Sequence, residues 1–77
     1  MEVTFSKIKR VNMDILNQLT DKDLLYISDK YIVARRIYMS EEFWMLRTFS
    51  TYKHVKNRGK MSWKEYYFHE KLKEKQL

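Results

Sequence analysis

Histidine and carboxylate side chains are the groups in this sequence best suited to acid–base chemistry, but their spacing argues against it. Neither His54 nor His69 has a carboxylate at a spacing suited to orienting an imidazole for proton transfer. Glu65 and Glu70 have the positions of helix-surface residues, and Glu65 fits a helix cap. We therefore predict no catalytic residue and no enzymatic activity.

Metal and cofactor sites are also disfavoured by composition. The chain has no cysteine, and its two histidines are 15 positions apart with no second pair, so we predict no metal site. Gly59 is the only glycine. Phosphate-binding loops and nucleophile elbows need several glycines, because only glycine lets the backbone approach a ligand closely. We predict no cofactor and no small-molecule substrate.

Positive charge is concentrated in the second half of the chain. The net charge of the 77 residues is +6. Residues 1–44 carry seven basic and seven acidic side chains, whereas residues 45–77 carry nine basic and three acidic ones. Residues 45–77 are therefore the expected contact region for nucleic acid or another acidic partner.

Residues 51–60 lack helical periodicity and form a predicted basic loop. Its candidate contacts to an acidic partner or to nucleic acid are Lys53, Lys56, Arg58 and Lys60. Such clusters attract backbone phosphates, but they also occur as solvated loops that keep a basic protein soluble. Trp63, Tyr66 and Tyr67 either stack on bases or pack into the core, and their spacing on one helix face favours packing.

The composition predicts one small folded domain over residues 1–77. Hydrophobic residues make up 44% of the chain and aromatic residues 16%, which is too apolar for a disordered segment. Apolar residues recur every third or fourth position, so we predict an all-α fold, a small orthogonal bundle of four to five short helices. No stretch approaches the ~20 apolar residues that cross a bilayer. With no signal-peptide pattern at its start, the chain is expected to be intracellular, in the cytoplasm or nucleus, without membrane contact.

Three helices are predicted in the first half. Residues 13–19 have apolar side chains at helical spacing. Thr20 is a suitable N-cap for a helix over residues 21–28, whose expected inward face is Leu24, Leu25 and Ile27. Asp29 is the expected cap of a third helix that runs through residues 31–38.

Two more helices are predicted in the second half. Ser40, followed by two glutamates, marks the start of a helix that carries Phe43 and Trp44, which we expect in the core. Ser62 and Glu65 match a capping box at the start of a C-terminal helix over residues 62–75.

Residues 19–46, LTDKDLLYISDKYIVARRIYMSEEFWML, resemble an F-box domain. Asp-Leu-Leu is followed by a polar–apolar helix and a closing Phe-Trp, and Asp23 and Trp44 are 21 positions apart, as in the usual F-box pattern. The Ser-Trp-Lys-Glu-Tyr-Tyr of residues 62–67 is similar to the Trp-Lys/Arg-x-x-Tyr element that follows many F-boxes. F-box-like chains of large DNA viruses look similar.

The resemblance implies an F-box-like core at about residues 13–49 with an added C-terminal helix, and a partner. F-box domains bind a Skp-type adaptor of a cullin ubiquitin ligase. The adaptor face expected here consists of Leu16, Leu19, Leu24, Leu25 and Ile27. The resemblance to viral F-box-like chains also implies that the protein is located in an infected host cell or in a virion. The alternative function is a small basic nucleic-acid-binding or virion-associated structural protein.

Overall fold

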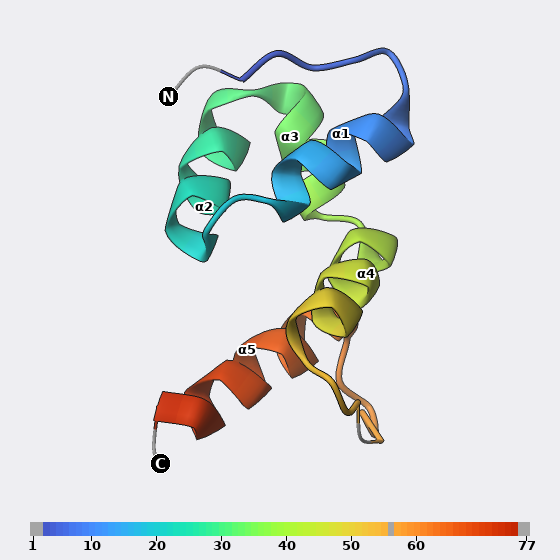
Figure 1. The fold of residues 1–77 in the computed structure, drawn as a ribbon, viewed down its shortest axis with the longest axis vertical. Coiled ribbons are helices and arrows are strands. Elements are labelled where there is room, and N and C mark those ends of the chain that lie inside the picture. The colour runs from blue at the N-terminus through green and yellow to red at the C-terminus, as the bar shows by residue number, and fades with distance from the viewer. Residues whose placement is uncertain (1–2, 56, 76–77) are drawn as a thin grey trace. The chain divides into compact units, whose positions relative to one another are not determined.

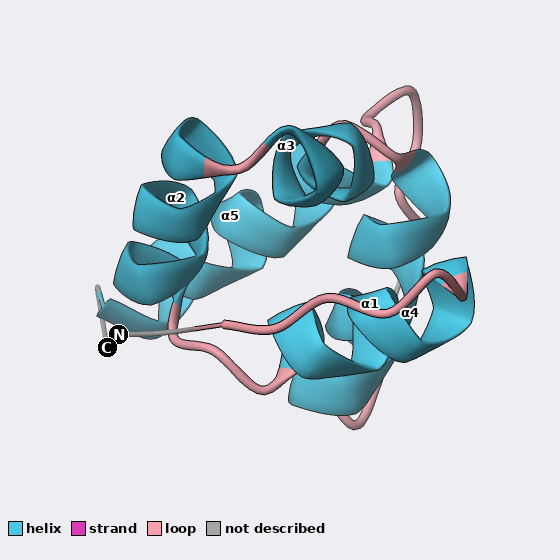
Figure 2. Ribbon diagram, turned by 90° about the horizontal axis from the view of Figure 1, so that it is seen from above, coloured by secondary structure: helices cyan, strands magenta, loops and turns pink. Residues whose placement is uncertain are grey.

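Five α-helices make up the part of the chain that the computed structural model describes, residues 3–55 and 57–75 (Figures 1 and 2). No strand occurs within those residues. In chain order the helices are α1 (Lys9–Asn17), α2 (Asp21–Lys30), α3 (Ile32–Tyr38), α4 (Glu41–Thr51) and α5 (Trp63–Lys75). The predicted all-α class is confirmed.

Two compact units divide the chain. Unit 1 is Met1–Ser40 and contains α1 to α3, and unit 2 is Glu41–Leu77 and contains α4 and α5. The boundary between the units falls inside residues 13–49, the expected F-box-like core. The single domain expected over residues 1–77 stays a prediction.

In unit 1, α3 packs against both α1 and α2. Each helix contributes two apolar side chains to the interior, namely Met13, Leu16, Leu24, Ile27, Ala34 and Ile37. These side chains are spaced three apart along each helix, and that spacing places them on one face. Burial of this small set removes apolar surface from water, which is the main favourable term for unit 1.

Helix α1 begins four residues before the predicted start at residue 13 and ends at Asn17. The side chain of Asn12 explains the early start, because its Oδ1 accepts from the Ser6 amide at 2.7 Å and its Nδ2 donates to the Ser6 carbonyl at 2.8 Å. These bonds fix the segment before α1 without a side-chain cap, so no cap residue marks the start in the sequence. Leu19 lies beyond the helix in a turn, where its amide donates to the Leu16 carbonyl at 3.1 Å.

The N-cap predicted for α2 is confirmed. Thr20 Oγ1 accepts from the Asp23 amide at 3.2 Å. Asp21 and Asp23 lie in the first turn, where their charges complement the positive end of the helix dipole. The start of α2 therefore follows from side chains that the sequence displays.

The N-cap predicted for α3 is wrong. Asp29 lies inside α2, which continues to Lys30, and Tyr31 is the extended residue (φ −119°, ψ 131°) that separates the two helices. The Arg35 guanidinium donates to the carbonyls of Ser28 at 3.4 Å and Asp29 at 2.9 Å. Because these carbonyls are at the end of α2, the contacts stabilise its two additional residues, Asp29 and Lys30.

Unit 2 is held together by aromatic rings from α4 and α5. Phe43 and Trp44 are each 1% exposed, so their predicted place in the core is confirmed. The Trp44 ring centroid lies 5.3 Å from the centroids of both Tyr67 and Phe68 and 5.4 Å from that of Phe43. At these separations ring pairs add favourable contact to simple area burial.

The capping box predicted at the start of α5 is confirmed. The Glu65 amide donates to Ser62 Oγ at 3.1 Å, and the Ser62 amide donates to Glu65 Oε1 at 3.5 Å. A third contact comes from α4, because Glu41 Oε2 accepts from the Trp63 amide at 3.0 Å. Three amides at the start of unit 2's second helix therefore have side-chain acceptors.

Candidate interaction surface

Two neighbouring apolar side chains lie on the outward face of α2. Leu24 and Ile27 are fully buried, whereas Leu25 and Tyr26 are each 57% exposed. The prediction that Leu25 faces inward is therefore wrong. Burial at 24 and 27 directs residues 25 and 26 to the solvent, because one helical turn takes 3.6 residues. We call Leu25, Tyr26 and Lys30 the α2 face.

Local bonds at both ends hold the α2 face in place. The Thr20 cap closes the start of α2, and Arg35 binds the carbonyls at its end. Within the helix, Ser28 Oγ donates to the Leu24 carbonyl at 2.7 Å in a buried position. A helix with bonds at both ends has an ordered backbone, so binding a partner does not carry the further cost of ordering that backbone.

The α2 face extends toward aromatic rings of unit 1. Lys30 Nζ lies 5.9 Å from the Tyr26 ring centroid and 5.6 Å from that of Tyr31. Tyr31 in turn meets Phe5 edge-to-face at 5.6 Å, in the segment that precedes α1 (Figure 1). The Lys30 ammonium group therefore lies near two rings, the exposed ring of Tyr26 on α2 and the half-buried ring of Tyr31 just before α3.

The structure separates the five residues of the expected adaptor face. Leu16, Leu24 and Ile27 have no exposed surface, so in this structure they support the fold of unit 1 from within. Leu19 is half-buried and Leu25 is exposed. Leu25 faces away from Leu24 because consecutive helix positions point in different directions, and Leu19 lies beyond the end of α1, so the group divides between interior and solvent.

In the basic loop, the side chains of Lys53 and Lys60 are exposed. Lys56, also predicted as a contact, lies outside the described residues. Arg58 has internal partners, because it donates to the Met61 carbonyl at 2.9 Å and its guanidinium lies 4.1 Å from the Trp63 ring centroid. This arrangement places the Arg58 charge against an aromatic face in unit 2.

Gly59 shapes the same loop. The Gly59 amide donates to Asn57 Oδ1 at 2.9 Å, and the Met61 amide donates to the Arg58 carbonyl at 3.2 Å. Gly59 has φ 62°, a left-handed conformation that a glycine adopts without steric cost. The one glycine of the chain therefore serves a tight turn.

The three aromatic residues considered for base stacking differ in their exposure to solvent. Tyr66 and Tyr67 are 2% and 3% exposed, so neither ring has a free face for a base, and the packing interpretation holds. Trp63 is half-buried and packs at 5.4 Å against the ring of Phe49, which is 54% exposed. One cation of residues 45–77, Arg47, is also buried, at 5% exposure, with its guanidinium 5.5 Å from the Tyr67 ring centroid.

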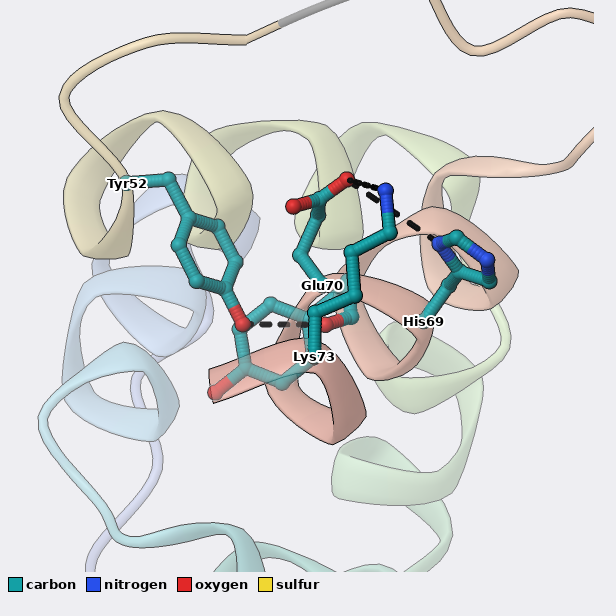
Figure 3. Close-up of polar contacts among 5 residues, drawn as sticks. Tyr52, His69, Glu70 and Lys73 are labelled. Atoms are coloured by element: carbon teal, nitrogen blue, oxygen red, sulfur yellow. Dashed lines mark hydrogen bonds and ion pairs between the residues drawn. The ribbon is translucent and has the colours of Figure 1, made fainter. Parts of the chain in front are cut away.

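Polar contacts along α5 are surface or packing interactions (Figure 3). Glu70 Oε1 lies 4.0 Å from His69 Nδ1 and 3.6 Å from Lys73 Nζ, and the side chains of His69 and Lys73 are about half exposed. The Tyr52 hydroxyl donates to the Tyr67 carbonyl at 3.0 Å, which joins the end of α4 to α5. None of these contacts aligns an acid with a base over a cavity.

Two further features bear on partners. Within residues 3–55 and 57–75, no group of three His, Cys, Asp or Glu side chains is placed to hold a metal ion. No helix in the same described ranges has the length and apolar character required to cross a bilayer.

Sequence reasoning missed Tyr26, Lys30 and Arg35. Counting 3.6 residues per turn from Leu24 would have placed Tyr26 on the opposite, solvent side, with Lys30 near it four positions later. Arg35 had no such signal, because its role depends on where α2 ends.

Comparison with known proteins found no matching family model, no matching curated protein and no matching solved structure. The class that the structure itself defines is a small all-helical protein with an apolar pair on an outward helix face.

Proposed function

We propose that this chain is a protein–protein interaction module that binds its partner through the α2 face. The observation that supports this function is the pair Leu25 and Tyr26, two adjacent apolar side chains with 57% exposure each on a helix that is bonded at both ends. Exposed apolar residues are common singly, but an adjacent pair with a neighbouring cation is a surface that a partner stabilises by covering it.

The specific partner in this proposal is a Skp-type adaptor of a cullin ubiquitin ligase. It is supported by the resemblance to F-box domains over residues 19–46. In that stretch Asp23 lies in the first turn of α2, Leu25 is exposed, and Trp44 is buried. The proposed contact residues are Leu25 and Tyr26 with the exposed part of Leu19.

A co-purification experiment with a Skp-type adaptor tests this proposal. Leu25→Asp places a charge in the proposed contact, so adaptor capture should fall at least about tenfold, the effect of 1.4 kcal/mol. Leu72→Asp is the matched control, since Leu72 is 60% exposed in α5 and its variant should bind like the wild type. Leu24→Asp is less informative, because a charge at this fully buried site unfolds unit 1.

Two outcomes would contradict the proposal. The first is a wild-type chain that captures no adaptor, which removes the Skp-type partner. The second is a Leu25→Asp variant that binds as well as Leu72→Asp, which removes the α2 face as the contact. Circular dichroism on each variant tests whether helix content is unchanged.

A further inference from the structure

A groove in unit 1 combines positive charge with an apolar floor. Its volume is about 590 Å³, and it is lined by the segment before α1, by α1 and by α3, with no residue of α2. The lining residues are Ser6, Lys7, Lys9, Asn12, Val33, Arg36 and Ile37. A groove of this size accommodates a few side chains of a ligand.

Charge is the first indication of what would bind there. Lys7, Lys9 and Arg36 are exposed, and no acidic side chain lines the groove. Among the described residues, none of these three cations forms an ion pair. The lining therefore favours an anionic ligand.

The start of α1 adds to the same positive potential. Helix N-termini attract negative charge, yet the first turn of α1 contains no acidic residue and its N-cap, Ile8, provides no side-chain acceptor. Lys7 and Lys9 instead place two cations at this positive end. Because this arrangement is unfavourable in the free chain, an anionic partner would relieve it.

The side chains at the floor and rim of the groove indicate which kind of anionic ligand it favours. Val33 is 38% exposed, and with Ile37 it supplies an aliphatic floor without an aromatic ring on which a base would stack. The uncharged polar side chain of Asn12 is already bonded, since it binds both backbone groups of Ser6. What remains for a ligand is charge around an aliphatic surface.

We infer that this groove is a second interaction site, which binds an acidic peptide segment with an aliphatic side chain between its carboxylates. The carboxylates lie against Lys7, Lys9 and Arg36, and the aliphatic side chain covers Val33 and Ile37. The site is separate from the α2 face and does not depend on the function proposed for it.

Fluorescence anisotropy with a labelled peptide tests this inference on the full chain. The probe has two central leucines flanked on each side by three glutamates, and a control probe has serines in place of the leucines. We expect saturable binding of the leucine peptide that weakens with added salt, and binding of the serine peptide at least about fivefold weaker because the floor stays uncovered.

Charge-reversal variants locate the site. Arg36→Glu and Lys9→Glu should each weaken peptide binding about fivefold or more, because attraction becomes repulsion. Lys22→Glu is the matched control, an exposed lysine on α2 outside the groove, and should change the affinity less than twofold. Thermal melts establish that each variant is folded.

Three results would overturn the inference. The first is no binding of the leucine peptide at about 50 mM salt. The second is a Lys22→Glu variant that weakens binding as much as Arg36→Glu, which would indicate a general charge effect. The third is a single-stranded oligonucleotide that binds more tightly than the peptide and loses affinity in Arg36→Glu, which would assign the groove to nucleic acid.

Discussion

Among single residues, Trp44 packs against three other rings in unit 2. Its indole meets Phe43, Tyr67 and Phe68, and Lys64 Nζ lies 5.9 Å from its ring centroid. The indole therefore joins α4 to α5 at full burial, while Phe49, on the same helix, meets Trp63 near the solvent. Trp44 and Phe49, two of the aromatic positions of α4, differ in burial and should differ in their effect on stability.

We predict that Trp44→Ala lowers the free energy of unfolding by about 3–5 kcal/mol, the usual cost of truncating a buried aromatic residue. Phe49→Ala is the matched control and should cost about 1 kcal/mol, since it removes one partly exposed ring pair. Thermal or urea unfolding measures both. Equal losses for the two variants would show that burial of the indole is not what stabilises unit 2.

Residue identity predicted burial well for two large aromatic side chains, since Trp44 and Tyr67 were expected in the core and lie there. It predicted burial poorly where a neighbour decides. Arg47 was counted only as one of the nine basic side chains of residues 45–77, but it is buried with its guanidinium near the Tyr67 ring. A guanidinium can pack against an aromatic face, and sequence spacing alone does not reveal which ring will be available.

At the scale of the helix, start signals are the most predictable feature of this chain. The Thr20 cap and the capping box of Ser62 and Glu65 both form as expected, because each needs only residues three positions apart. Helix α1 has no such signal, and its start depends on Asn12 bonding back to Ser6. The last two residues of α2, which extend it beyond the predicted end at Ser28, depend on Arg35, seven residues beyond Ser28.

We predict that Ser62→Ala destabilises unit 2 by about 1 kcal/mol, because the Glu65 amide loses its acceptor. Ser50→Ala, in the last turns of α4, should change stability by less than about 0.5 kcal/mol, since alanine favours helix. Chemical denaturation of both variants measures the difference. A loss in Ser50→Ala as large as in Ser62→Ala would argue against the cap as the cause.

For the whole molecule, the α2 face and its burial pattern were only partly predictable. The outward direction of Leu25 follows from helix geometry once α2 is placed, but the sequence-based assignment put it inside with Leu24 and Ile27. The basic groove was not predicted at all, because Lys9 and Arg36 come together only when α1 packs on α3. Contacts between helices are long-range, and periodicity does not report them.

Net charge is the whole-molecule property that tests the nucleic-acid alternative. Arg47 is buried and Arg58 stacks on Trp63, so two of the nine basic residues of 45–77 are engaged within unit 2 and are less available to an acidic partner. We predict that the chain shifts duplex DNA in a gel only at low salt, and that Lys53→Glu with Lys60→Glu removes the shift.

The salt dependence of DNA binding can also contradict this prediction. A shift that persists at about 200 mM salt and survives reversal of Lys53 and Lys60 would favour a nucleic-acid role over the protein-interaction role. Lys22→Glu with Lys30→Glu reverses two exposed lysines in unit 1 and serves as the charge-matched control.

The bond between Glu41 and the Trp63 amide has a practical consequence for dissecting the chain. Glu41 is the first residue of its unit, so a fragment trimmed even one position too far would damage the beginnings of two helices at once. The shortest useful piece of the second half therefore retains this glutamate, and a blocked amino terminus would keep an added positive charge away from its carboxylate.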